Sequence, residues 1–321
     1  MSENQKVQEA ATGKLFGELF AAYDDEAFKR SVELFKARFE DAGFDLSWFK
    51  GKACLDAGCG GGRYSIAMAH LGAAHVSGID LGEQGVADAR KRALALGADH
   101  VDFRVGSVAD LPFPDESFDC IIHSGVLQHT ADPIGVLREL SRVLRPGGMI
   151  YMLVYATEGL RWPLVQMLRP IAQRLGFDVL DRSVSLAGLP VNRRRTYLDD
   201  LFVPYIDFYS WPCLDGLLKD FGYSNIERWN KGRLDHEENL ESYCHDLKGF
   251  FEVFDAVAKL PVGSVSDAEA KLVQQATNIC MDVLAYAETV AESVRKGEIA
   301  DHDGRALAIG QGHHRLVAWK L

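Results

Sequence analysis

The chain has 321 residues, of which 47% are hydrophobic and 25% charged, and this composition excludes a disordered chain, a collagen-like chain and a small disulfide scaffold. Its 35 Lys and Arg residues against 46 Asp and Glu residues give a net charge of −11, which disfavours a nucleic-acid partner because such proteins need a basic face. No apolar run approaches the ~18 residues of a membrane span, so we expect no membrane segment. The first ten residues are polar and carry no secretory signal, so we expect a cytoplasmic protein. The six cysteines form no C-x-x-C pair, so we expect no metal site.

The first half of the chain divides into a helical start and an alternating core. Residues 1–50 carry apolar side chains at helical spacing, which predicts an N-terminal helical cap. In residues 51–156 short apolar runs alternate with helical stretches, which predicts a parallel sheet covered on both faces. The expected strands are 53–57, 75–80, 101–106, 118–125 and 149–156, and the expected helices are 63–71, 83–96 and 133–144. Ligands of such sheets lie outside the carboxyl ends of the strands.

The second half interrupts this alternation twice. Residues 157–210 are rich in Arg, Pro and aromatic residues, and we interpret them as a substrate lid inserted over the site. Residues 211–230 resume the pattern with a helix and a strand, and residues 313–321 alternate like a strand. We infer that these two segments lie together at the end of the core sheet. Residues 231–312 between them have mostly helical spacing and form a second insertion.

The strongest local signal is a glycine-rich turn after the first expected strand. Gly58 and Gly60 begin a run of glycines that ends where a helix is expected. Glycines let the backbone bend tightly and let a ligand approach the main chain. Asp80 ends the next expected strand, where an acidic side chain can accept hydrogen bonds from both hydroxyls of a ribose. The alternative is a purely structural turn between strand and helix.

The spacing of the glycines argues against a dinucleotide. The dinucleotide motif is G-x-G-x-x-G, and Arg63 stands where its third glycine belongs. Asp56, just before the turn, would place a negative charge near a pyrophosphate. A carboxylate there suits a ligand that carries an ammonium or sulfonium group, which favours S-adenosylmethionine.

Several motifs in the same order and spacing resemble those of the class I S-adenosylmethionine-dependent methyltransferases, of the Rossmann-like, small-molecule type. The motifs are GID (78–80), GSVADLPFPDESFD (106–119), GVLQHTADP (125–133) and LSRVLRPGGMI (140–150). The resemblance covers roughly residues 50 to 155, with weaker support at 211–229 and 314–321. It implies a doubly wound α/β fold: a mostly parallel seven-stranded sheet with an antiparallel last strand, to which this chain adds N-terminal helices and two insertions.

The same resemblance implies which residues hold the cofactor S-adenosylmethionine. The glycine turn would contact the methionine part and the ribose, and the segment after the third strand would hold the adenine. At that segment Ser107 stands where many relatives carry Asp; a hydroxyl accepts more weakly than a carboxylate, and Asp110 offers a nearby replacement. The implied cofactor-binding residues are Asp56, Gly58, Gly60, Arg63, Asp80, Leu81, Ser107, Val108, His123 and Gly125.

The candidate catalytic residues are three histidines, because an oxygen or nitrogen nucleophile must lose its proton when it is methylated. His129 lies in the loop after the fourth strand and is the preferred base, although it could instead cap or pack the following helix. His123 lies at the strand end and suits a cofactor-lining role better. His236 belongs to the cluster 235–238, which is a base, a metal site or the solvated acidic start of a helix.

The candidate substrate-binding residues come mainly from the expected lid. Arg194, in a run of three arginines, could clamp a carboxylate or phosphate or lie on a solvated face. The tyrosines offer apolar area with a polar group, as small-molecule sites do, and Tyr23 either closes over the cofactor or packs as an ordinary tyrosine. The tyrosines are Tyr23, Tyr155, Tyr197, Tyr205 and Tyr209.

These observations predict an enzyme that transfers a methyl group from S-adenosylmethionine to an oxygen or nitrogen of a small metabolite by in-line displacement. One alternative is a protein or RNA methyltransferase, which the net charge and the expected lid disfavour. Others are a non-catalytic partner subunit that binds the cofactor, and other chemistry on the same cofactor. Residues 231–312 cover the site or form the interface of a homodimer, and both remain open.

Overall fold

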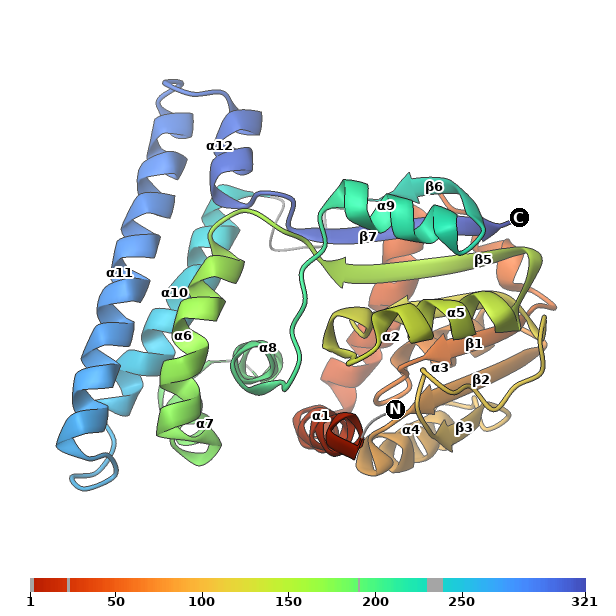
Figure 1. Ribbon diagram of the computed structural model, residues 1–321, viewed down its shortest axis with the longest axis horizontal. Helices are drawn as coiled ribbons and strands as arrows, with labels where there is room; N and C mark the ends of the chain where they lie inside the picture. The colour runs from red at the N-terminus through yellow and green to blue at the C-terminus, as the bar shows by residue number, and fades with distance from the viewer. Residues whose placement is uncertain (1–2, 22–23, 190, 230–238) are drawn as a thin grey trace. The chain divides into compact units, whose positions relative to one another are not determined.

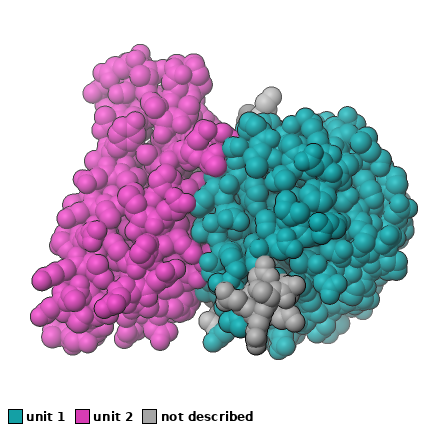
Figure 2. Space-filling view, viewed as in Figure 1, with its two compact units in different colours: residues 1–156, 204–234, 313–321 teal, residues 157–203, 235–312 magenta. Residues whose placement is uncertain are grey.

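The computed structural model describes residues 3–21, 24–189, 191–229 and 239–321, and it divides into two compact units (Figure 1). Unit 1 consists of Met1–Ala156, Pro204–Leu234 and His313–Leu321, and unit 2 consists of Thr157–Val203 and Asp235–Gly312 (Figure 2). The two insertions therefore fold together as one unit. Residues 204–210, which the composition groups with the lid, belong to unit 1.

Unit 1 is built on a seven-stranded sheet with the order β3-β2-β1-β4-β5-β7-β6. β7 pairs antiparallel with both β5 and β6, and the other pairs are parallel, which confirms the predicted fold class. The strands are β1 Ala53–Ala57, β2 His75–Asp80, β3 Asp102–Val105, β4 Phe118–Ser124, β5 Leu144–Tyr155, β6 Tyr223–Arg228 and β7 His313–Lys320. The carboxyl ends of β1, β2 and β4 meet at one edge of the sheet, where the candidate site residues lie.

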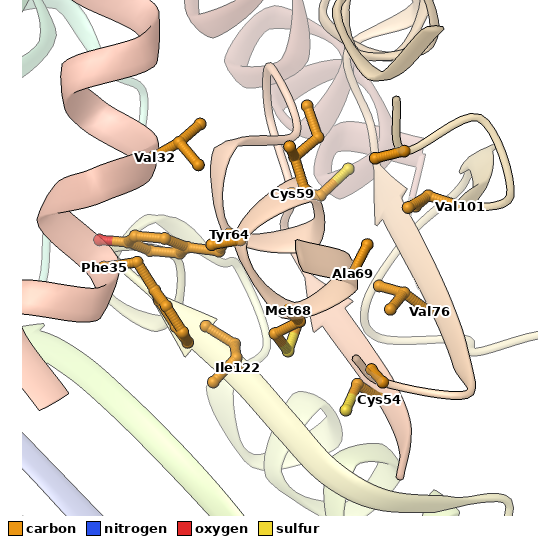
Figure 3. Close-up of a cluster of buried hydrophobic side chains, with 14 of the residues drawn as sticks. Val32, Phe35, Cys54, Cys59, Tyr64, Met68, Ala69, Val76, Val101 and Ile122 are labelled. Atoms are coloured by element: carbon orange, nitrogen blue, oxygen red, sulfur yellow. The ribbon is translucent and has the colours of Figure 1, made fainter. Parts of the chain in front are cut away.

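Helices cover both faces of this sheet (Figure 1). One apolar cluster joins α2, α3 and α4 to one face, and a second joins α5 and α9 to the other. Figure 3 shows the first cluster, in which Phe35 of α2 lies beside Tyr64 of α3 and Ile122 of β4. The helices of unit 1 are α1 Glu3–Ala21, α2 Asp25–Asp41, α3 Arg63–His70, α4 Glu83–Ala95, α5 Pro133–Val143 and α9 Trp211–Asp220, with short 3-10 helices η1 Leu46–Phe49 and η2 Leu127–His129.

Unit 2 is helical and contains a buried ion triad. The Arg161 guanidinium contacts the carboxylates of Asp200, at 2.5 Å, and of Asp246, and all three side chains are buried. Its helices are α6 Arg161–Leu175, α7 Phe177–Leu186, α8 Val191–Phe202, α10 Leu240–Val257, α11 Asp267–Arg295 and α12 Asp301–Ala308. α10 packs against both α7 and α11, so segments from the two insertions share this core. Within the described ranges, no helix is both long and apolar enough to cross a membrane.

Candidate functional site

The turn after β1 depends on the backbone freedom of glycine. Gly58 has a φ of 88°, and a Cβ at this position would lie 2.3 Å from Cγ2 of Val126. The amides of Gly58 and Cys59 both donate to the carbonyl of Ile79, at 2.8 and 3.0 Å. Gly60, with a φ of 49°, continues the turn. A side chain at Gly58 would therefore both strain the backbone and displace the loop after β4.

The Asp80 carboxylate joins this turn to the end of β2. Oδ2 accepts a hydrogen bond from the amide of Gly60 and Oδ1 accepts one from the amide of Gly82, each at 2.8 Å. Burial raises the pKa of Asp80, although both amide bonds oppose the shift. Each carboxylate oxygen has about two acceptor positions, so Asp80 can still accept hydrogen bonds from the two hydroxyls of a ribose.

Asp56 has a structural task that the sequence did not predict. Its Oδ2 accepts hydrogen bonds from the amide of Ser65 at 2.9 Å and from the Ser65 hydroxyl at 2.7 Å. The buried carboxylate thereby caps the first turn of α3, where helix amides lack partners. Burial raises the pKa of Asp56 to about 6, against the opposing effect of the Ser65 bonds. Its predicted contact with a cationic ligand is additional to this role.

Arg63 lies against the aromatic residue that follows it. The Arg63 guanidinium lies over the ring of Tyr64, 4.5 Å from the centroid. The Tyr64 hydroxyl accepts a hydrogen bond from Nη1 of Arg38 at 2.8 Å. Burial alone would raise the pKa of Tyr64, but Arg63 and Arg38 lower it to about 8. Sequence analysis missed Tyr64 and Arg38, because their contact joins helices far apart in the chain.

The segment after β3 includes a carboxylate that the sequence did not single out. Ser107 Oγ accepts from the amide of Ala109 at 3.2 Å and also hydrogen-bonds the carboxylate of Glu9 on α1. Val108 beside it is buried, whereas Asp110, the expected replacement for the missing acid, is exposed. Glu9 lies in a polar stretch without a motif, so only the packing of α1 shows its position.

His123 is a neutral, fully buried residue at the end of β4. Its Nδ1–H donates to the carbonyl of Ala57 at 2.8 Å, and Nε2 has no hydrogen-bond partner among the described residues. Burial lowers the pKa of His123 to about 4. The side chain is therefore a weak base, and its position favours lining the site over general-base catalysis. Gly125, with a φ of 75°, follows at the strand end.

His129 lies in a cluster with two of the predicted tyrosines. Its Nδ1 lies 3.0 Å from the carbonyl oxygen of Tyr205, to which it must donate, so the neutral ring carries its lone pair on Nε2. The imidazole packs edge-to-face on Tyr155, with 5.3 Å between ring centroids, and contacts Phe16 of α1. The Tyr205 hydroxyl donates to Oε1 of Gln8, also on α1. The structure thus brings His129, Tyr155 and Tyr205 together in unit 1.

The other predicted substrate residues lie in different surroundings. Tyr209 donates its amide to the carbonyl of Tyr155, and its buried hydroxyl has no partner in the described part of the chain. Tyr197 lies in the core of unit 2, where its hydroxyl donates to the carbonyl of Asp246 at 2.9 Å and its ring packs on Phe250. Because Tyr197 is buried and its hydroxyl is used, packing accounts for it better than the expected substrate contact.

Three predicted residues cannot be placed. Tyr23 and His236 lie outside the described residues, as does the side chain of Arg194. The acidic cluster 235–238 lies outside them too. In the part of the chain that the structure describes, no three His, Cys, Asp or Glu side chains are grouped to hold a metal ion.

The arrangement as a whole fits an adenosyl cofactor. A glycine turn that leaves no room for side chains meets an acceptor for ribose hydroxyls in Asp80. The Nε2 atom of His123 adds a buried acceptor whose hydrogen bond is unmade, and such atoms are costly unless a ligand or water satisfies them. These groups gather where ligands of doubly wound sheets bind.

Comparison with known proteins identifies the family. Residues 55–152 match the model of a methyltransferase domain. A demethylmenaquinone methyltransferase of Clavibacter sepedonicus is 32% identical over 67% of this chain and 83% of its own length. A ubiquinone biosynthesis O-methyltransferase of Xanthomonas axonopodis pv. citri is 39% identical over 38% of this chain and 47% of its own length. The crystal structure of the [4+2]-cyclase SpnF shares the fold, with a TM-score of 0.51 at 19% identity over 99% of this chain and 95% of that one.

These matches differ in how much of each relative's length the chain covers. The chain spans 47% and 38% of the length of the first two curated relatives. The Clavibacter relative is matched over most of its length. On sequence, on fold and on the geometry of the glycine turn, the chain belongs to the class I S-adenosylmethionine-dependent methyltransferases.

Proposed function

We propose that this protein transfers a methyl group from S-adenosylmethionine to an oxygen or nitrogen of a small molecule. The observation that carries the proposal is the hydrogen-bonded unit of Gly60 and Asp80, which fixes the glycine turn at the carboxyl edge of the sheet. The turn and Asp80 would hold the cofactor, with Arg63, Leu81, Val108 and Gly125 around it. When bound, the cofactor supplies a methyl group already activated by a positive sulfur.

The protein itself would orient the cofactor and the acceptor, exclude water, and supply a base for the proton of the nucleophile. His129 is the proposed base, because donation from Nδ1 to Tyr205 orients the ring and leaves the lone pair on Nε2. Tyr155 and Phe16 hold the two sides of the imidazole. A positioned base of this kind contributes about 10²–10⁴-fold to rate.

The class of acceptor is supported by the relatives. One relative is named a ubiquinone biosynthesis O-methyltransferase and another a demethylmenaquinone methyltransferase, so we propose a small aromatic acceptor of quinol type. The Tyr155 ring, which packs edge-to-face on His129, offers aromatic surface for such a ring. The −11 net charge disfavours RNA as the acceptor.

Calorimetry with S-adenosylmethionine and S-adenosylhomocysteine tests the cofactor assignment. The wild type should bind both, and Asp80→Ala should bind at least about tenfold more weakly, because it loses the ribose acceptor and the brace on Gly60. Asp102→Ala is the matched control, since Asp102 begins the neighbouring strand β3 at the opposite edge and pairs with Arg104. If the wild type shows no binding at millimolar ligand, the assignment is wrong.

Mass spectrometry of a panel of catechols, quinols and amines tests the transfer itself. A methylated product with stoichiometric S-adenosylhomocysteine supports the proposal. His129→Ala should lower kcat by about 10²-fold or more with little change in cofactor affinity. Cofactor binding without a methylated product would favour a non-catalytic partner subunit or different chemistry.

A further inference from the structure

The segment after β3, which the family resemblance places on the adenine side of the proposed cofactor site, has Ser107 where that resemblance implies an acid, and α1 supplies a different one. Ser107 occupies the position of that acid. The Glu9 side chain on α1 is buried, with 9% of its surface exposed. Burial raises the pKa of Glu9, and a hydrogen bond with Ser107 opposes this shift. A carboxyl group is therefore present at this position, although it comes from a segment nearly 100 residues earlier in the chain.

Tight backbone packing fixes α1 at this place. A Cβ on Gly13 would lie 3.0 Å from the carbonyl carbon of Leu81, and a Cβ on Gly82 would lie 2.8 Å from the carbonyl oxygen of Gly13. Two glycines thus let the helix lie directly on the connection between β2 and α4. This connection follows Asp80, the proposed ribose acceptor. Glu9, one turn before Gly13, is therefore held beside the adenosine part of the site.

The hydrogen bonds of Ser107 leave Glu9 as the stronger acceptor. Ser107 has one hydroxyl proton, and its oxygen already accepts from the amide of Ala109, so the proton is the group that Ser107 gives to the Glu9 carboxylate. One such bond uses only part of the acceptor capacity of a carboxylate. Asp110, the other acid nearby, is exposed.

We propose that Glu9 recognises the 6-amino group of the cofactor's adenine and so selects an adenosyl over an inosyl nucleoside. This proposal rests on the proposed function, because it needs the cofactor in the site. The amino group donates to the carboxylate, whereas the 6-oxo group of hypoxanthine presents an acceptor to it. A buried carboxylate opposite a carbonyl loses a hydrogen bond and gains a repulsion.

The experiment is calorimetric titration with two ligands, S-adenosylhomocysteine and S-inosylhomocysteine. The wild type should prefer the adenosyl ligand by about tenfold or more. In Glu9→Gln the amide can turn its NH₂ group toward the 6-oxo group, so the preference should fall to within about threefold. Glu9→Ala, which removes every polar atom beyond Cβ, should also reduce the preference. Asp110→Asn makes the same chemical change at the exposed acid and should keep the wild-type ratio.

The possible results separate this proposal from the assignment of the cofactor. A wild type that binds both nucleosides equally, or a Glu9→Gln variant that keeps the full preference, overturns the role of Glu9 and leaves the cofactor assignment intact. Loss of the preference in Asp110→Asn assigns the contact to Asp110 instead. A wild type that binds neither ligand overturns the proposed function and this proposal together. Circular dichroism melting of each variant checks that α1 and the sheet remain folded.

Discussion

Two carboxylates lie at the carboxyl ends of neighbouring strands of unit 1, and each accepts hydrogen bonds from backbone amides of the turns or helices beside it. Asp80 accepts from Gly60 and Gly82, and Asp56 accepts from Ser65. The sequence predicted both as ligand contacts because their positions match the family motif. It could not predict their second role, since an amide partner depends on where the chain turns after the strand. The two roles are compatible, because a carboxylate has several acceptor positions.

Asp56 should make folding stability depend on pH in an unusual direction. Burial raises its pKa to about 6 in the folded protein, against about 4 in an unfolded chain. Between these values the folded state binds more protons than the unfolded state, so stability contributed by this group falls as pH rises from about 4 to about 6. We expect the unfolding free energy of the wild type, relative to Asp56→Asn, to fall by about 3 kcal/mol over this range.

Urea denaturation of both proteins at pH 4, 5, 6 and 7 measures this difference. Asn can still accept from Ser65 through its carbonyl oxygen, so Asp56→Asn removes the titration with little change in shape. The difference should be flat above about pH 7. A difference that rises with pH between 4 and 6 would mean that the folded protein stabilises the charged form of Asp56.

Gly58 gives a prediction about space as well as backbone angle. Gly58→Ala introduces a Cβ 2.3 Å from Val126 at a φ of 88°, whereas Gly97→Ala introduces one at a φ of 70° with no atom within 4 Å. Gly97→Ala should cost about 1 kcal/mol for the left-handed conformation alone. Gly58→Ala should cost at least about 1 kcal/mol more and weaken binding of S-adenosylhomocysteine. Chemical denaturation and calorimetry measure both, and equal costs for the two variants would refute the clash.

Among the elements, α1 is the one whose existence the sequence predicted and whose position it did not. Apolar spacing between residues 1 and 50 predicted helices, and the structure has α1 and α2 there. The spacing says nothing about which loop a helix covers. The contact with Leu81 and Gly82 appears only in the folded chain, because it joins backbone atoms about 70 residues apart.

Two glycines of α1 provide a matched pair of substitutions. Gly→Ala inside a helix normally stabilises by about 1 kcal/mol. At Gly17 the new Cβ would meet Gln84 at 3.5 Å, an ordinary contact, so Gly17→Ala should show this gain. At Gly13 it would meet the backbone of Leu81 at 3.0 Å, so Gly13→Ala should lose the gain and be at least about 1 kcal/mol less stable than Gly17→Ala. Urea denaturation measures the stabilities of the two variants. Equal stabilities of Gly13→Ala and Gly17→Ala would show that α1 is not tightly packed against Leu81.

The strands were predicted well where each is a short apolar run between glycines. β1 and β2 have the predicted bounds, β3, β4 and β7 differ by about one residue at their ends, and β6 lies within the segment 211–230 where a strand was expected. β5 begins at Leu144 and not at 149, because the chain pairs with Phe118 before an irregularity and continues through Pro146, Gly147 and Gly148. Those three residues have the composition of a turn, and they lie between the two registers in which β5 pairs with β4, where Gly147 has a φ of 72°. The residues proposed to hold the cofactor come from motifs at strand ends, whereas the positions of Tyr64 and Glu9 depend on packing between elements.

At the scale of the whole molecule, each unit is assembled from separate pieces of the chain. The break in β-α alternation predicted two insertions, 157–210 and 231–312, but no local pattern reports that the observed segments 157–203 and 235–312 share a core. Arg161 of the first piece shows the link, because it contacts Asp246 of the second. A charged residue near the start of a helix is usually exposed to solvent, so the sequence alone does not predict this contact.

Arg161→Met should therefore destabilise unit 2 and leave ligand binding at the proposed cofactor site of unit 1 unchanged. The change leaves Asp200 and Asp246 buried without their cation, and breaking a buried ion pair in this way costs about 3–5 kcal/mol. Lys248→Met, which removes an exposed cation from the same unit, should cost about 0.5 kcal/mol or less. The Kd for S-adenosylhomocysteine should stay within about twofold of wild type, because Gly58, Asp80 and Glu9 all belong to unit 1. Thermal melting followed by far-ultraviolet circular dichroism measures the stability, and calorimetry measures the Kd. A large loss of nucleoside affinity at temperatures where Arg161→Met remains folded would show that unit 2 takes part in holding the cofactor.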